Sequence, residues 1–245
     1  MSKSDEYRHA FRHLKSADID SYLCAHSGLP GPRGNLELVQ VVADEGDEAL
    51  FVHLLTYTPD VAPTGSPREF LAVCGAVGIG KLLAGGDMRW ISSLRQLASD
   101  PRWRVREGVA MALQRYGDAN MPALIAVMAE WSTGSCLEQR AAAAALCEPR
   151  LLVNGEQALE VLAILDAITF SMTQAADRKS DAFKVLRKAM GYCWSVAVAA
   201  LPREGKRRME KWFTTADKDV IWVMRENLKK NRLARMDSQW VEKWK

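Results

Sequence analysis

The sequence has few of the features that mark membrane, secreted or metal-binding proteins. No stretch approaches the roughly 18 consecutive apolar residues that a membrane-spanning helix needs. The charged segment 1–22 has no continuous apolar core of the kind that a secretory signal contains. The five cysteines are odd in number and scattered, and no two are separated by just two residues, as zinc knuckles and redox pairs require. We therefore expect a cytoplasmic protein with reduced thiols, no membrane partner and no metal site.

Neither sign of charge is in large excess. The 33 Lys and Arg residues stand against 30 Asp and Glu residues, a net charge of +3, so any attraction to phosphate must come from local clustering. Signals for β-strands are also scarce. What the chain does have is 48% apolar and 26% charged residues over 245 positions, which is typical of a globular protein with a sizeable core.

Two segments rich in Gly and Pro divide the first third of the chain. Residues 27–35 and 58–66 are predicted to be loops, because Gly supplies positive φ angles and Pro lacks a backbone donor. The apolar spacing predicts one amphipathic helix over 7–18, another over 36–44, and a short third over 51–57. This N-terminal part, residues 1–84, is the less regular part of the sequence.

Segment 75–81 matches the spacing of a nucleotide-binding loop, namely glycine, four residues, glycine and lysine. The match fails at Leu82, because the loop requires Ser or Thr there to hold a metal ion. The loop also requires a strand before it, whereas residues 69–74 follow a helix-start signal at Pro67. We interpret the segment as a helix whose glycines allow close packing, and we expect no nucleotide cofactor.

From residue 85 onward the pattern predicts helices joined by short connections. The predicted helices cover 90–97, 105–113, 121–131, 137–146, 159–168, 183–200 and 220–228, and the last continues into the basic segment 229–232. We expect a single all-α domain over 1–245 in which 85–245 forms the clearer two-helix repeats.

Two stretches that lie 119 positions apart share one pattern of Asp, Trp, Arg, Glu and a branched apolar residue. The first consists of Asp100, Trp103, Arg106, Glu107 and Val109, and the second of Asp219, Trp222, Arg225, Glu226 and Leu228. Arginines that follow predicted turns, Arg106, Arg140, Arg187 and Arg225, are spaced by 34, 47 and 38 residues. These spacings are typical of two-helix repeats, which have periods of about 40 residues.

Residues 100–113 resemble the second helix of a HEAT repeat, which has a proline-containing turn and an Asp followed six residues later by Arg. Asp100 with Arg106, and Asp219 with Arg225, match that spacing, while 137–148 and 181–200 are degenerate copies. The resemblance implies a right-handed α-α superhelix of the armadillo type, whose second helices form a concave binding face. One branch of the family, the HEAT-like alkylpurine DNA glycosylases, holds damaged DNA on that face. This chain does not match the catalytic set of that branch residue by residue, so we assign no catalytic residue.

The Asp and Arg residues of the repeated pattern have two interpretations. In the structural one, each carboxylate caps a helix start and pairs with arginines of its own or an adjacent repeat. In the functional one, basic and aromatic side chains form a binding surface. The candidates for that surface are Arg102, Trp103, Arg104, Arg106, Arg140, Arg187, Lys188, Arg225, Lys229 and Lys230.

Two functions remain open from the sequence. The favoured hypothesis is a non-catalytic scaffold that binds a protein or peptide partner on its concave face, without a cofactor. The alternative is a DNA-binding protein related to the HEAT-like glycosylases, which in its enzymatic form excises damaged bases. A groove of continuous positive charge would favour DNA, and a groove of mixed charge would favour a protein.

Overall fold

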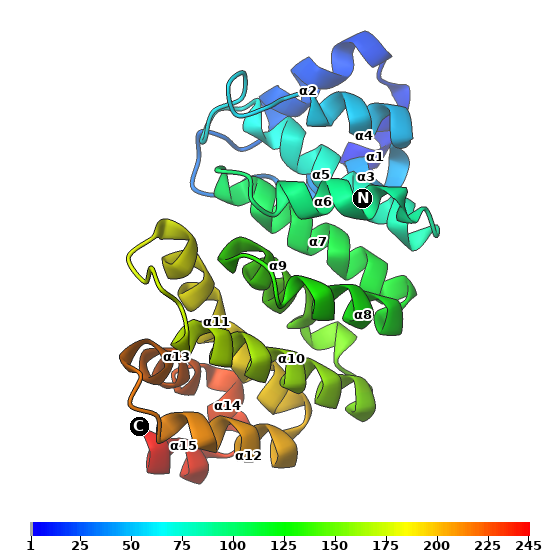
Figure 1. Cartoon of the computed structure of the whole chain (residues 1–245). Helices are drawn as coiled ribbons and strands as arrows, with labels where there is room; N and C mark the ends of the chain where they lie inside the picture. Colours follow the sequence, from blue (N-terminus) through cyan, green and yellow to red (C-terminus); the bar gives the residue numbers. More distant parts are fainter. Residues whose placement is uncertain (1) are drawn as a thin grey trace. The chain divides into compact units, whose positions relative to one another are not determined.

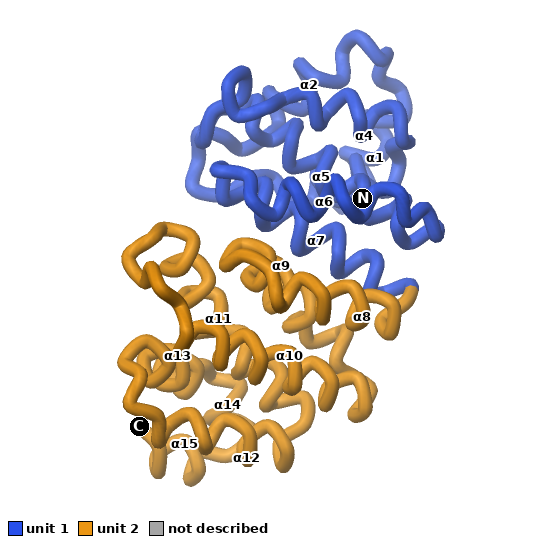
Figure 2. Tube along the Cα trace, in the orientation of Figure 1, with its two compact units in different colours: residues 1–119 blue, residues 120–245 orange. Residues whose placement is uncertain are grey.

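The computed structural model describes residues 2–245, and this part of the chain is helical. It contains fifteen α-helices, three short 3₁₀ turns and no strand, which confirms the all-α prediction. The helices form two compact units, residues 1–119 (unit 1) and residues 120–245 (unit 2), which Figure 2 distinguishes by colour. Within the described range, no helix combines the length and the apolar character needed to cross a membrane.

Unit 1 contains seven α-helices and two 3₁₀ turns, η1 (Ser16–Asp18) and η2 (Met88–Trp90). The α-helices are α1 (Lys3–His13), α2 (Ile19–His26), α3 (Leu36–Glu45), α4 (Glu48–Leu55), α5 (Glu69–Ala84), α6 (Ile91–Leu97) and α7 (Trp103–Ala119). Side chains that accept hydrogen bonds from backbone N–H groups in the first turn mark several helix starts. Ser2 and Asp5 form a reciprocal capping box at α1, and Asn35 and Asp47 cap α3 and α4.

Helix α5 forms the centre of unit 1. Every residue from Glu69 to Gly80 is buried, as expected of a helix that is apolar all round. A Cβ atom at Gly78 would lie 2.2 Å from the ring of Phe51 in α4, and one at Gly80 would lie 2.5 Å from the carbonyl oxygen of Ala112 in α7. The glycines therefore let α4 and α7 approach α5 closely (Figure 1), which confirms the packing interpretation of segment 75–81.

Helices α3, α5 and α7 run in the same direction. Lys81, near the end of α5, donates hydrogen bonds from Nζ to the backbone oxygens of Asp44 and Gly46 at the end of α3. Glu69, at the start of α5, accepts a hydrogen bond from Arg104 at the start of α7. These contacts join residues 35 to 37 positions apart, so each of the three helices meets the next in nearly the same register.

Unit 2 contains eight α-helices and one 3₁₀ turn, η3 (Pro149–Leu151). The α-helices are α8 (Met121–Trp131), α9 (Cys136–Leu146), α10 (Gly155–Thr173), α11 (Asp181–Ala200), α12 (Pro202–Phe213), α13 (Lys218–Leu228), α14 (Asn231–Met236) and α15 (Ser238–Trp244). Helix α11 packs against α9, α10, α12 and α13. Its Trp194 is fully buried and donates from Nε1 to the Thr169 hydroxyl of α10, which satisfies the only polar atom of the indole.

Two predicted helix ends are wrong. The first helix ends at His13 because Leu14 has extended backbone angles, and a separate helix, α2, follows at 19–26. The helix predicted to continue into the basic segment 229–232 ends at Leu228, because Lys230 is also extended. Residues 229–230 of the basic segment join α13 to α14, residues 231–232 begin α14, and the short helix α15 follows α14.

Candidate binding groove

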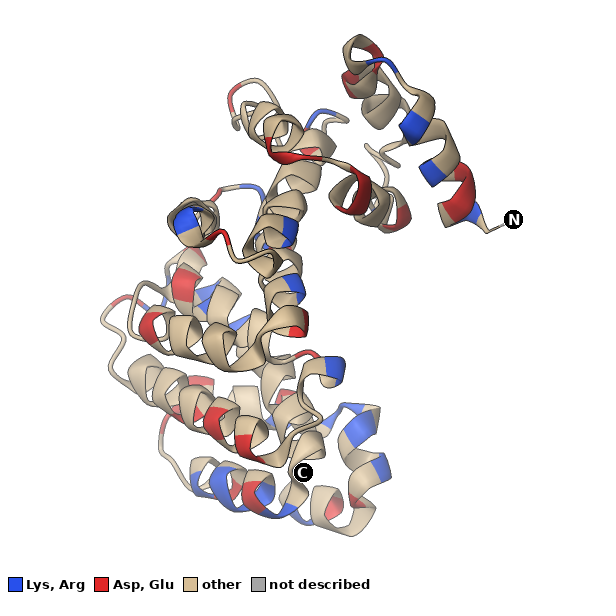
Figure 3. Ribbon diagram, turned by 90° about the vertical axis from the view of Figure 1, so that its right-hand side faces the viewer, with Lys and Arg blue, Asp and Glu red and all other residues tan. Residues whose placement is uncertain are grey.

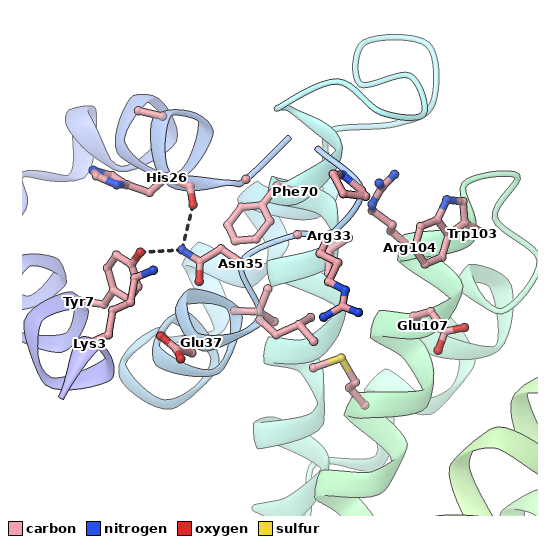
Figure 4. Close-up of a pocket in the computed structure, with 18 residues that line it drawn as sticks. Lys3, Tyr7, His26, Arg33, Asn35, Glu37, Phe70, Trp103, Arg104 and Glu107 are labelled. Atoms are coloured by element: carbon pink, nitrogen blue, oxygen red, sulfur yellow. Dashed lines mark hydrogen bonds between the residues drawn. The ribbon is translucent and has the colours of Figure 1, made fainter. Parts of the chain in front are cut away.

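A groove of about 1060 Å³ lies wholly within unit 1 (Figure 4). Its lining residues come from α1, from the end of α2 and the segment that follows it, from the first turns of α3 and α5, and from α7. The volume is at the upper end of the range for pockets that hold small ligands, which is about 300–1,000 Å³. Because all of its lining residues belong to one compact unit, the groove is a property of that unit alone.

The floor of the groove is apolar. Phe70 and Val73 of α5 line it, together with Val39 of α3 and Met111 of α7. Phe70 is 1% exposed and Val73 6% exposed, so the floor is well packed from below. At the rim, Leu36 is 58% exposed, which leaves apolar surface available to a partner.

Asn35 fixes the wall that faces α1. Its Nδ2 donates one hydrogen bond to Tyr7 Oη at 2.9 Å and another to the backbone oxygen of His26 at 2.9 Å (Figure 4). Its Oδ1 accepts from the N–H of Leu38 and so caps α3. One amide therefore connects the end of the loop 27–35 to α1, α2 and α3.

The groove is lined by both basic and acidic side chains, and only some of them form hydrogen bonds or ion pairs. Among residues 2–245, the exposed Arg33 and Glu37 form no hydrogen bond or ion pair. Figure 4 shows the Arg33 guanidinium directed into the open space of the groove. Lys3 lies with its ammonium 5.8 Å from the Tyr7 ring centroid. Arg33 is thus a free cation at the mouth of an apolar cavity.

Arg104, in contrast, is fixed in place. It donates from Nη1 to the buried Glu69 carboxylate at 3.2 Å and from Nη2 to the backbone oxygen of Gly31 at 3.2 Å. Its guanidinium also lies 4.5 Å from the ring centroid of Trp103, a cation-π contact. Trp103 remains 47% exposed beside the groove. The structure thus brings Trp103 and Arg104, two of the predicted site residues, to one wall of the cavity.

Arg102 and Arg106 have structural contacts instead. Arg102 is 2% exposed and pairs with Asp100 through two hydrogen bonds of 2.9 and 2.7 Å, while its Nη1 donates to the backbone oxygens of Tyr57 and Ala62. Arg106 donates to the backbone oxygen of Asp100 at 2.5 Å. The prediction of Arg102 as a surface-binding residue is therefore corrected, because its guanidinium is buried and saturated by the turn before α7 and by the loop 58–66.

The predicted residues of unit 2 also divide into buried and exposed groups. Arg140 is 7% exposed within α9. The Nε atom of Arg187 forms an ion pair with Asp219 at 2.9 Å, and its guanidinium lies 3.9 Å from the Trp222 ring centroid. The exposed group lies on α11, on α13 and just after α13, and its members are Lys188, Arg225, Lys229 and the half-buried Lys230.

The two aspartates of the repeated sequence pattern occupy different structural positions. Asp100 precedes α7 by three residues and accepts from the backbone N–H of Arg102. Asp219 lies inside the first turn of α13, where Asp217 is the capping residue, and it pairs with Arg178 and Arg187. The structural interpretation therefore holds at both sites for the pairing with arginines, but its capping part is wrong for Asp219, because Asp217 caps α13.

A polar cluster elsewhere in unit 1 joins α2 to α4. The carboxylate of Asp20 accepts a hydrogen bond from Tyr57 Oη at 2.6 Å and lies 2.8 Å from His53 Nε2. This hydrogen bond, together with burial, raises the pKa of Tyr57 to about 12. Cys24 lies beside the cluster, and burial raises the pKa of its thiol, which disfavours the reactive thiolate.

Most residues of the groove were not identified from the sequence. Tyr7, Arg33 and Phe70 carry no motif, and the best available signal was Asn35, a capping residue between a Gly- and Pro-rich loop and an apolar run. Among the described residues, no group of three or more His, Cys, Asp or Glu side chains is arranged to hold a metal ion. Comparison with known proteins finds no matching family model, no matching curated protein and no matching solved structure.

Proposed function

We propose that the chain is a HEAT-like helical-repeat interaction module and that its unit 1 groove binds a short peptide segment of a partner protein. The observation that carries the proposal is the apolar floor beneath the free cation Arg33. Such a surface offers burial to an apolar side chain and an ion pair to a neighbouring carboxylate.

The helix contacts support the repeat architecture. In unit 1, α4 packs antiparallel to α5, since Gly75 meets Leu54 and Gly78 meets Phe51. Helices α3, α5 and α7 are parallel and joined by contacts over 35 to 37 residues. This alternation is what two-helix repeats produce when they stack into a right-handed superhelix. In such a stack the equivalent helices of successive repeats form one continuous face, on which α3, α5 and α7 supply three of the walls of the groove.

The chemistry of the groove favours a peptide that has an apolar side chain beside an acidic one. The apolar side chain would enter the cavity above Phe70 and Val73, which expose little surface themselves, and the carboxylate would pair with Arg33. Trp103 and Leu36 add exposed apolar surface at the rim. Trp and Arg are the residue types that most often dominate the binding energy of interfaces, because they combine a large contact area with directional hydrogen bonds.

The charge of unit 1 favours a peptide over DNA at this groove. Across unit 1 the sequence has 13 Lys and Arg residues against 15 Asp and Glu residues. Two carboxylates, Glu37 and Glu107, also line the groove itself. A polyanion would meet repulsion here, since DNA binding depends mainly on neutralising phosphates with Lys and Arg.

Peptide selection with the full chain tests this function. Peptides selected from a random display library are expected to share an apolar residue next to Asp or Glu. Titration calorimetry with a selected peptide should show binding weakened at least tenfold by Arg33→Glu and by Trp103→Ala. Arg89→Glu, an equal charge change at an exposed arginine outside the groove, serves as the control. Selected peptides that bind Arg33→Glu and Trp103→Ala as tightly as the unmodified chain would overturn the proposal.

A further inference from the structure

Helices α11 and α13 of unit 2 pack side by side in the same direction. The Arg187 guanidinium of α11 lies over the Trp222 ring of α13. One turn further along, a Cβ atom at Gly191 would lie 3.2 Å from both Glu226 and Trp222. Further still, the backbone N–H of Ser195 donates to Asn227 Oδ1 at 2.7 Å. Because the contacts advance together along both helices, the exposed sides of α11 and α13 form one surface.

That surface is basic. Lys188 and Tyr192 are exposed and stand one turn apart on α11, while Arg225 of α13 and Lys229, the residue that caps the end of α13, are exposed and stand one turn apart. On each helix these residues lie on the opposite side from the residues that are buried in the core of unit 2. We refer to this surface, with the adjoining Lys230 and Arg232, as the α11/α13 face.

Tyr192 is the centre of the α11/α13 face. It is 44% exposed, although it belongs to a helix whose other aromatic residues, Phe183 and Trp194, are buried. The Arg232 guanidinium lies 4.8 Å from its ring centroid and donates to its hydroxyl oxygen, and the Lys230 ammonium lies 5.9 Å from the same centroid. An exposed aromatic ring surrounded by cations is the arrangement on which nucleic-acid bases stack while their phosphates are neutralised.

Most of the positive charge on the α11/α13 face is unmatched. Glu226 pairs with Lys229, and Asp181 pairs with Lys184 at the start of α11. Among residues 2–245, no carboxylate forms an ion pair with the remaining cations, which are Lys188, Arg225, Lys230 and Arg232. Unit 2 as a whole has 20 Lys and Arg residues against 15 Asp and Glu residues, and Figure 3 shows blue Lys and Arg on several of the helices near the C-terminus.

We propose that the α11/α13 face binds single-stranded nucleic acid, with a base stacked on Tyr192 and phosphates held by Lys188 and Arg225. A single strand is favoured over a duplex because its bases are free to stack on an exposed ring, whereas a duplex base must first be unstacked. This site lies in unit 2 and does not depend on the peptide groove of unit 1.

The test measures fluorescence anisotropy of labelled oligothymidylate and oligouridylate of about 12 nucleotides, a length within typical single-strand site sizes. The full chain is titrated at several salt concentrations. The double variant Lys188→Gln/Arg225→Gln is expected to bind at least tenfold more weakly. Its slope of log affinity against log salt should be shallower by about 1.4, since each lost phosphate contact removes about 0.7. The control is Arg203→Gln/Lys243→Gln, which removes the same charge from exposed positions on α12 and α15 and should retain the slope.

Variants of Tyr192 distinguish base stacking from general electrostatic attraction to phosphates. Tyr192→Ala is expected to weaken binding about tenfold, because base stacking on an aromatic ring contributes about 1–3 kcal/mol per base. Tyr192→Phe keeps the ring and should bind nearly as well as the unmodified chain. Circular dichroism of each variant confirms that it is folded.

Several results would overturn the proposal. They are no binding at low salt, equal loss in the control pair, unchanged affinity of Tyr192→Ala, or preference for duplex DNA over the single strand. Binding to vesicles of anionic phospholipid without binding to oligonucleotides would assign the face to a membrane surface instead. None of these results bears on the peptide groove, whose test uses variants of unit 1.

Discussion

Asp100 and Arg102 form a buried ion pair in which both carboxylate oxygens of Asp100 accept hydrogen bonds from the Arg102 guanidinium. The side chains are 5% and 3% exposed. Arg102 also donates to two backbone oxygens near and within the loop 58–66. The pair therefore fixes a connection between two elements that are about 40 residues apart in the chain.

Removing one partner of this pair should destabilise unit 1 strongly. We expect Asp100→Asn to lower the free energy of unfolding by about 3–5 kcal/mol, because the Arg102 charge would stay buried without a counterion. Urea unfolding followed by circular dichroism measures the change. Asp87→Asn is the matched control: its ion pair with Arg89 is largely exposed, so the loss should stay below about 1 kcal/mol. Equal losses in the two variants would contradict the assigned role.

Two glycine-to-alanine substitutions should have opposite effects. At Gly80, the added Cβ would lie 2.5–2.9 Å from backbone atoms of Ala112, so α7 would have to move. We expect Gly80→Ala to destabilise by about 1–3 kcal/mol, as overpacked cores do. At Gly155 in α10, the nearest atom would be Leu201 Cδ1 at 3.9 Å, an ordinary contact. Gly155→Ala should be neutral or stabilising by up to about 1 kcal/mol, since Ala favours the helix. Unfolding curves of both variants test the pair, and a tolerated Gly80→Ala would refute the close approach.

Tyr57 should make stability depend on alkaline pH. The pKa of Tyr57 is raised from 10.0 to about 12, mainly by its hydrogen bond to Asp20 and to a lesser extent by burial. Because the folded pKa is the higher one, the stabilisation is fully present below pH 10 and is lost as the pH rises toward 12. The ultraviolet absorbance of tyrosinate, measured as the difference between the unmodified chain and Tyr57→Phe, should titrate near the raised value. A difference spectrum that titrates at the ordinary tyrosine pKa would count against the Asp20 contact.

The cysteines should differ in reactivity according to burial. Burial raises the pKa of the Cys74 thiol well above its ordinary value, and burial together with a hydrogen bond to Cys193 does the same for Cys147. We expect these two thiols to resist alkylation in the folded protein and to react on unfolding in urea. Cys24 and Cys136 are partly exposed and should be alkylated first. Mass spectrometry of peptides after timed alkylation gives the order, and early labelling of Cys74 would contradict the burial.

The sequence predicted helices where local signals agree. The apolar spacing predicts helix α8 with its observed ends, and in the structure Asn120 caps it and Pro122 lies in its first turn. The helices α14 and α15 were missed, since six or seven residues are too few to establish a period. The spacing of residues within one helix also cannot show that Gly191 is needed for the close approach of α13, because that contact depends on a residue of another helix.

Most residues of the groove cannot be predicted from the sequence, because they are far apart in the chain. Tyr7, Asn35, Phe70 and Arg104 meet only after α1, α3, α5 and α7 have packed. Trp103 and Arg104 were found because an exposed aromatic beside arginines is a visible pattern. The same pattern included Arg102, whose burial depends on the backbone oxygens of a loop some 40 residues earlier.

Lys81 occupies the position at which a nucleotide-binding loop would present its lysine to phosphate oxygens. Here its ammonium holds two peptide oxygens at the end of α3, where the aligned peptide dipoles place partial negative charge. The lysine therefore binds the carbonyl oxygens at the end of α3 in place of the phosphate oxygens of a nucleotide. Acetylation of Lys81 would remove that charge and leave a single amide N–H for the two carbonyl groups, so a modification at this one surface lysine would weaken the contact between α3 and α5.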